Sequence, residues 1–323
     1  MNGRLEIGFQ VWAQFVAWDD LMRAGTQIDR LGFDTLWSND HFYPLVGTDA
    51  AINNALHGPI FEGWMVLSGF AHTTERVRLG CMVSGGAYRN VGLLGKMATT
   101  LDHASHGRAI VGLGAGWYER EHASFGFDFP PTRQRLDRLE ESARALRLLF
   151  SGAPVDFEGT WVNLREARLD PGPVQSILPL LIGGSGPRRT LPIVARYADM
   201  WNGEGSPEEF AQKSQLLSDL CRTEGRTPDA VTRTVGLPPP FIRSTQGEAA
   251  HAAIEVLCAH GMPHAVAEQY ASTSPLVGPV ERVADHLAAY GASGADGVVF
   301  DWPAPFDEVT LAALSGPIRD AIA

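Results

Sequence analysis

An acid and an imidazole stand side by side where a short apolar run ends, in the stretch GFDTLWSNDHFYP at residues 32–44. The run reads as a buried strand, because Gly32 and Asn39 bound it. A side chain at a strand end can reach a functional site, and His41 is able to exchange a proton near neutral pH. One interpretation is therefore that Asp40 and His41 belong to a functional site. The alternative is that Asp40 caps a turn and His41 is a solvated loop residue.

A glycine-rich turn follows another strand-like run, in the stretch GLGAGWYEREHASFG at residues 112–126. Trp117 comes directly after the glycines, where its indole can stack on a flat ring or simply pack in the fold. Glu119, Arg120 and Glu121 are most simply a solvated helix start. From this stretch alone both interpretations of Trp117 remain open.

A second glycine-rich turn lies in the stretch LLIGGSGPRRT at residues 180–190, between a buried strand and a helix whose first turn suits Pro187. Free backbone N–H groups at such a junction can hold a phosphate, and Arg188 and Arg189 add positive charge. The order of strand, glycines and helix start favours an anion site. The alternative is that the glycines only make a tight turn.

The composition narrows the classes of partner. The 323 residues carry 26 Lys and Arg against 37 Asp and Glu, a formal charge of −11, without a basic run, so nucleic acid is not expected as a partner. The three cysteines are widely spaced, which fits a reduced, cytoplasmic protein. The first residues lack the pattern of a secretory leader, and no stretch approaches the roughly 20 apolar residues of a membrane helix. A soluble protein without membrane contact is expected.

A histidine-rich stretch, HAAIEVLCAHGMPH at residues 251–264, raises the question of a metal site. In a helix, His251 and Cys258 lie two turns apart, which is not the spacing of a helical zinc site. We therefore predict no metal.

Strand-like and helical patterns alternate along the whole chain and predict a (β/α)8 barrel in one domain spanning residues 1–323. The alternative, a doubly wound open sheet, lacks its G-x-G-x-x-G turn. Three insertions are expected, at about 41–60, 155–170 and 237–280; a small hairpin is expected in the one at 155–170, and a helix at about 246–260 in the one at 237–280. The predicted strands lie at 4–12, 35–40, 77–83, 108–114, 178–183, 198–202, 231–236 and 297–302.

In these stretches the chain resembles the luciferase-like flavin and deazaflavin oxidoreductases, and among them the branch that depends on coenzyme F420. The resemblance runs in order from residue 5 to about 235, and it departs from the family pattern at Val91 and His106. The matching stretches are LGFDTLWSNDHFYP, ERVRLGCMVSGGAYRN, GKMATTLDHASHGRAIVGLGAGWYEREHASFGFDFPP, RQRLDRLEES, VDFEGTW, PVQSILPLLIGGSGPRRTL and ARYADMWN.

The resemblance implies a cofactor ring at the C-terminal face of the barrel. Asp40 and His41 match the acid and histidine that lie against the ring, and Met82 and Val83 match a non-proline cis peptide that supports it. Two turns match segments that hold the cofactor tail and phosphate, and they contain Gly114, Ala115, Gly116, Trp117, Gly183, Gly184, Ser185 and Gly186.

The expected function is hydride transfer between F420 and a small, apolar organic substrate, with His41 handling the proton and Asp40 orienting it. The apolar cavity is suggested by Trp12, Trp37, Phe42, Trp64 and Trp117. One alternative is an FMN-dependent monooxygenase that works with a separate flavin reductase, because both activities fit the same barrel. An alternative of another class is a cofactor-free binding protein. The family also implies a homodimer and, for either cofactor, an enzyme that reduces it.

Overall fold

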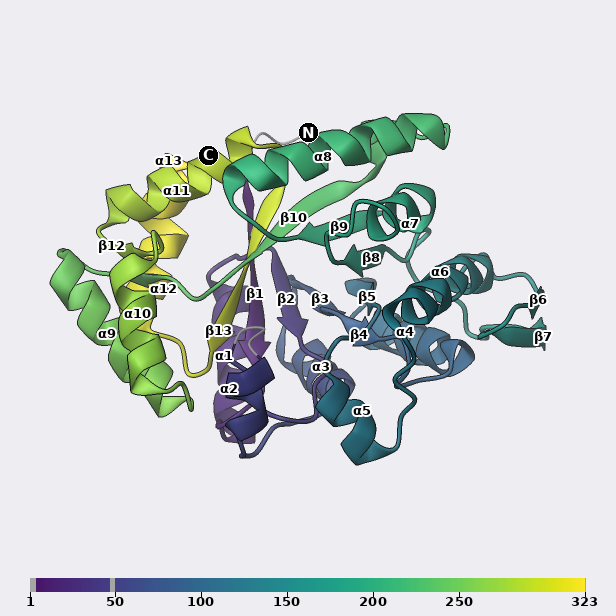
Figure 1. Ribbon diagram of the computed structural model, residues 1–323, viewed down its shortest axis with the longest axis horizontal. Helices are drawn as coiled ribbons and strands as arrows, with labels where there is room; N and C mark the ends of the chain where they lie inside the picture. Colours follow the sequence, from purple (N-terminus) through teal and green to yellow (C-terminus); the bar gives the residue numbers. More distant parts are fainter. Residues whose placement is uncertain (1–3, 47–49, 323) are drawn as a thin grey trace.

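The computed structural model describes residues 4–46 and 50–322. Eight parallel strands form a closed barrel (Figure 1). Each strand pairs with the next, including β3 with β5, and the last strand, β13, pairs with the first, β1. All eight predicted strands are present, which confirms the (β/α)8 barrel. The strands are β1 (Glu6–Trp12), β2 (Thr35–Ser38), β3 (Arg78–Cys81), β5 (Ala109–Gly114), β8 (Leu180–Gly183), β9 (Met200–Gly203), β10 (Thr232–Leu237) and β13 (Gly297–Pro303).

Helices surround the barrel. The first, α1 (Trp18–Arg30), buries Leu21 and Ile28 on one face and ends before Gly32, whose φ of 75° suits a residue without a side chain. Outside the insertions, the other helices are α3 (Gly63–Thr73), α4 (Val91–Ala104), α5 (Glu119–Phe125), α6 (Thr132–Leu149), α7 (Thr190–Tyr197), α8 (Pro207–Thr223), α11 (Val280–Ala292), α12 (Glu308–Ala313) and α13 (Arg319–Ala321), with short helical turns at Pro228–Ala230 and Leu314–Ile318. Among the described residues, no helix combines the length and the apolar character needed to cross a bilayer.

Alternation along the strands divides the barrel interior into layers. Side chains two residues apart on a strand point to the same side, and one inward layer is a packed apolar floor made by Trp37, Met82, Ile110, Leu181, Met200 and Val299. The next inward position is polar on three strands, at Asn39, Asn202 and Asp301. The barrel therefore closes on one side and presents polar groups at the C-terminal ends of its strands.

The three predicted insertions are present. The first contains α2 (Ala50–Ala55), while its residues 47–49 lie outside the described residues. The second is the hairpin of β6 (Val155–Glu158) and β7 (Asn163–Ala167), which projects at one edge (Figure 1). The short strand β4 (Ser84–Gly85) adds to β5.

The third insertion contains more helix than predicted. The expected helix is α9 (Gln246–Ala259), but the segment after it also forms α10 (His264–Thr273), followed by β12 (Val277–Gly278) paired with β11 (Phe241–Ile242). Ala267 and Ala271 of α10 lie four residues apart and pack with α9. This amphipathic helical pattern is short and lies among polar residues, which hid it in the sequence.

Candidate active site

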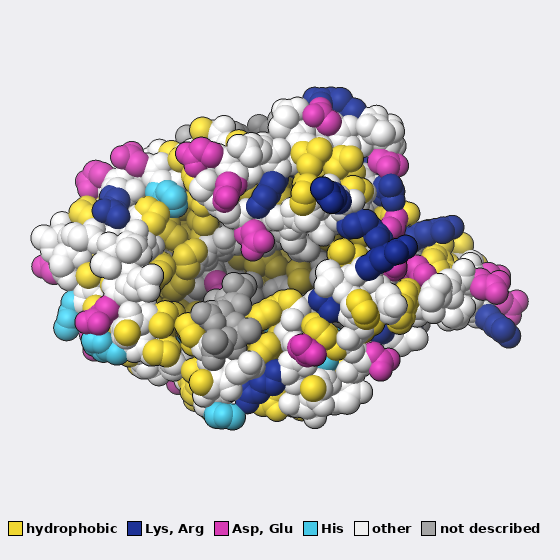
Figure 2. Space-filling view, viewed as in Figure 1, with side chains coloured by type: hydrophobic (Ala, Val, Ile, Leu, Met, Phe, Trp, Pro, Cys, Tyr) yellow, Lys and Arg dark blue, Asp and Glu magenta, His cyan; other side chains and the backbone are white. Residues whose placement is uncertain are grey.

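A cavity of about 790 Å³ lies at the C-terminal ends of the strands. Residues that end or follow all eight barrel strands line it, which is where barrel enzymes place their chemistry. In the space-filling view the molecule is hollowed near its centre, with hydrophobic side chains around the hollow (Figure 2). Among the predicted residues, Asp40, His41, Met82, Val83, Gly114, Ala115, Gly116, Trp117, Gly183 and Gly184 line this cavity.

His41 is held by a buried carboxylate. Its Nδ1 lies 2.9 Å from Oε2 of Glu121, whose side chain is fully buried while that of His41 is 20% exposed. Within the described part of the chain, Nε2 of His41 forms no hydrogen bond. One ring nitrogen is thus fixed by the protein, and the other is available to a bound molecule in the cavity.

Glu121 also organises the loop that carries His41. Its carboxylate accepts hydrogen bonds from the backbone N–H of Phe42 at 2.7 Å, that of Tyr43 at 3.0 Å, and the hydroxyl of Tyr88 at 2.9 Å. Burial opposes its ionisation, but the hydrogen bonds from His41 and the two backbone groups outweigh burial and lower the pKa of Glu121 below its ordinary value. Glu121 therefore stays an anion that can stabilise a protonated imidazole.

The prediction of a solvated helix start is wrong for Glu121. Tyr118, Glu121 and His122 are all buried on one face of the first turn of α5. Their spacing of i, i+3 and i+4 is a helical burial pattern, and it was the available signal in the sequence. The charged residues beside it concealed the pattern.

Asp40 forms no hydrogen bond with His41 among the described residues, so its predicted role in orienting His41 is not seen. Its Oδ2 accepts hydrogen bonds from Nη1 of Arg89 at 2.6 Å and from the backbone N–H of Gly85 at 3.0 Å. Burial raises the pKa of Asp40 above its ordinary value, although Arg89 acts in the opposite direction. Oδ1 is buried and has no partner among the described residues, in a side chain that lines the cavity. Such an atom is suited to accept a hydrogen bond from a bound ring.

One wall of the cavity is built around Val83. The peptide bond between Met82 and Val83 is cis, as the family resemblance implied. A Cβ at Gly114 would lie 2.4 Å from Cγ2 of Val83, and a Cβ at Gly183 would lie 2.9 Å from its Cγ1. Glycine at both positions therefore allows Val83 to occupy this wall and leaves the space above it open for a flat group.

The second glycine turn contributes less than predicted. Gly184 lines the cavity with φ of 111°, but its N–H is already bonded to the carbonyl of Asn202. Ser185 and Gly186 are not among the described residues that line the cavity. Arg189 pairs with Asp137 of α6 at 2.6 Å, so its charge is directed away from the predicted anion site.

The aromatic predictions divide between the cavity and the core. Trp117 lines the cavity, is 40% exposed, and stacks on Tyr118 with ring centroids 5.1 Å apart, so it both packs and presents a face. Trp12 also lines the cavity and donates its indole N–H to Asp301. Trp37 and Trp64 are buried. Asp301 itself gave no sequence signal beyond being an acid at the end of the last strand.

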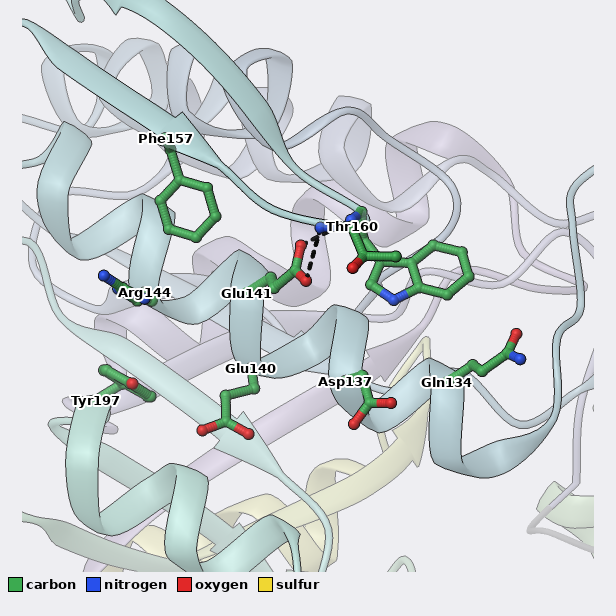
Figure 3. Close-up of a pocket in the computed structure, with 9 residues that line it drawn as sticks. Gln134, Asp137, Glu140, Glu141, Arg144, Phe157, Thr160 and Tyr197 are labelled. Atoms are coloured by element: carbon green, nitrogen blue, oxygen red, sulfur yellow. Dashed lines mark hydrogen bonds between the residues drawn. The ribbon is translucent and has the colours of Figure 1, made fainter.

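A second cavity, of about 660 Å³, lies beneath the β6–β7 hairpin, away from the strand ends. Figure 3 shows Glu141 of α6 pointing at the hairpin turn. Its carboxylate accepts hydrogen bonds from the backbone N–H groups of Thr160, Trp161 and Val162 at 2.7–3.0 Å. These bonds fix the hairpin to the barrel, so the acid here has a structural role.

A closed (β/α)8 barrel with a buried acid and histidine at its C-terminal cavity defines an enzyme of the barrel class. The family model described as luciferase-like monooxygenase matches residues 8–297. The chain therefore belongs to this family, and it is an oxidoreductase.

Two curated relatives illustrate the similarity. An uncharacterized protein of Mycobacterium tuberculosis is 30% identical over 80% of this chain and 90% of its own. An F420-dependent glucose-6-phosphate dehydrogenase of Kineococcus radiotolerans is 31% identical over 72% of this chain and 66% of its own.

Solved structures share the fold. An F420-dependent secondary alcohol dehydrogenase in complex with an F420–acetone adduct has a TM-score of 0.79 and 17% identity, with 99% of both chains covered. The FMN complex of the oxygenating constituent of 3,6-diketocamphane monooxygenase from Pseudomonas putida has a TM-score of 0.77 and 15% identity, also over 99% of both chains. At these identities the likeness concerns the fold alone.

Proposed function

We propose that this chain is an F420-dependent oxidoreductase that transfers a hydride between the deazaflavin and a small organic substrate. The observation that carries the proposal is the His41–Glu121 pair, which presents one free imidazole nitrogen to a cavity whose opposite wall is kept open by glycines. Sequence relatives named for F420-dependent activity support the deazaflavin over FMN.

The residues of the cavity fit a flat ring. The unpartnered Oδ1 of Asp40 would accept a hydrogen bond from it, and the wall formed by Met82 and Val83 would support one of its faces. The turn containing Gly114 and Gly116 would hold the start of the cofactor tail. When bound, F420 supplies the carbon that accepts or releases the hydride.

His41 manages the proton that accompanies the hydride. With Nδ1 bonded to Glu121, Nε2 takes the proton from a substrate or returns it. The buried anion of Glu121 stabilises the protonated ring, and its bonds to Phe42 and Tyr43 hold the loop in place. Glu121 is thus a positioning residue for His41, a role that we had expected of Asp40 from the family resemblance.

A second candidate is an FMN-dependent monooxygenase. It is favoured by the fold shared with FMN enzymes, and the same cavity would accept a flavin ring. A separate enzyme would then reduce the flavin, and the site would serve oxygen chemistry in place of hydride transfer to a substrate.

The proposal is tested by comparing the wild type with His41→Ala. F420 binding is followed by its fluorescence, and reduction of F420 by a panel of small alcohols and amines is followed by absorbance. We expect F420 affinity within threefold in both proteins, with turnover at least about 100-fold lower in the variant. Failure of the wild type to bind F420, or equal turnover in the two proteins, would overturn the proposal.

A further inference from the structure

The last barrel strand brings one acid into the cavity. Asp301 follows Val299 by two residues on β13, so both side chains point into the barrel, Val299 into the apolar floor and Asp301 into the cavity above it. Its Oδ1 accepts a hydrogen bond from Nε1 of Trp12 at 2.5 Å. Among the described residues, no basic side chain pairs with Asp301 and its Oδ2 has no partner.

The charged side chains that line the cavity are acidic. Arg89 neutralises Asp40, which leaves Asp301 and Glu204 as the acids that line it without such a partner. No Lys or Arg occurs among the described residues of the lining. Residues 47–49 are Gly, Thr and Asp in the sequence and add no basic side chain. An anionic substrate would therefore meet a carboxylate without a cation to bind it.

Asp301 lies across the barrel from the glycine turns. The strand order runs β1, β2, β3, β5, β8, β9, β10 and β13 around the closed ring, which puts β13 and β1 opposite β5 and β8 (Figure 1). The predicted cofactor turns follow β5 and β8, whereas Asp301 and Trp12 end β13 and β1. His41, which follows β2, lies near Asp301 and influences its ionisation.

We infer that Asp301 determines the class of substrate: an uncharged or cationic molecule that donates an O–H or N–H group to Oδ2, with anions such as phosphorylated sugars excluded. This inference rests on the proposed function, because it assigns the β5–β8 side to the cofactor. It refines the predicted apolar substrate, whose body would contact Trp12 and Leu237 on the same side. The carboxylate supplies the polar contact that fixes the donor group next to His41.

The test uses three small probes of one shape and different charge: 1-amino-2-propanol, 1,2-propanediol and lactate. Binding to the purified full chain, with and without F420, is followed by NMR of the indole N–H of Trp12, assigned with Trp12→Phe. This resonance reports directly on the carboxylate that Trp12 contacts. Asp301→Asn removes the charge, and Asp219→Asn is the matched control because it removes an acid that is 59% exposed on α8.

We expect the ammonium probe to bind at least tenfold more tightly than lactate, with the diol between them. The preference should fall below about threefold in Asp301→Asn and remain in Asp219→Asn. Equal affinities, no measurable binding of any probe, or an unchanged preference in Asp301→Asn would overturn the inference. So would a tenfold loss of F420 affinity in Asp301→Asn, because it would place the residue at the cofactor. If the wild type fails to bind F420 but still prefers the ammonium probe to lactate, the result would count against the proposed function alone.

Discussion

Replacing Asp301 by Asn is expected to stabilise the protein near neutral pH. Burial raises the pKa of Asp301 from its ordinary 3.8 to about 6, although the hydrogen bond from Trp12 and the nearby His41 act in the opposite direction. A carboxyl whose pKa is higher in the folded state binds more protons there than in the unfolded chain. Stability is therefore lost as the pH rises from about 4 through about 6.

The magnitude follows from the same comparison. One pKa unit corresponds to roughly 1.4 kcal/mol, so above pH 6 the ionised carboxylate lowers the free energy of unfolding by on the order of 3 kcal/mol. An Asn side chain avoids this cost and still offers an oxygen to the indole of Trp12. For a chain of 323 residues, the gain corresponds to an increase in Tm of about 4 °C.

Thermal unfolding of the wild type and Asp301→Asn at pH 7.5 and pH 4.5 checks this prediction. The variant should be more stable at pH 7.5, and most of the difference should disappear at pH 4.5. Among the described residues, the other titratable groups of the cavity lining are Asp40, His41, Tyr88 and Glu204, which are the same in both proteins, so the difference isolates Asp301. Equal stability at pH 7.5, or a gain that does not depend on pH, would refute the reasoning.

Three further predictions concern the site. Glu121→Gln should lower turnover by about 10²-fold or more with F420 affinity nearly unchanged, because His41 loses its anionic partner; a turnover within threefold of the wild type contradicts this role. Arg89→Met should lower the free energy of unfolding by about 3–5 kcal/mol in chemical denaturation, because it leaves Asp40 buried without its cation, and a loss below about 1 kcal/mol would show that Asp40 is not charged there. Gly114→Val should weaken F420 binding at least tenfold in a fluorescence titration, because its side chain would displace Val83, whereas the exposed variant Asp219→Asn should bind normally.

The sequence predicted the barrel well because its signals are local. Most barrel strands are short apolar runs, and several lead into glycine or a polar residue at the cavity, as in Asn39 two residues after Trp37. His41 could be proposed for the same reason, since it lies three residues after the end of β2. The helix α10 was missed because its apolar positions are mainly alanines between polar residues.

The partners within the site could not be predicted in the same way. Glu121 lies 80 residues from His41, and Arg89 lies 49 residues from Asp40. Adjacency in sequence suggested that Asp40 serves His41, but Asp40 bonds to Arg89 and Gly85, whereas His41 bonds to Glu121. Asp301 and Trp12 meet only because the first and last strands close the barrel.

Competition between the two cofactors tests whether the cavity is built for F420. The purified chain is dialysed against equal concentrations of F420 and FMN, and the bound cofactors are measured after release. We expect F420 to occupy the site in at least tenfold excess over FMN in the wild type and to lose occupancy in Gly114→Val. A preference for FMN, or retention of neither cofactor, would contradict it.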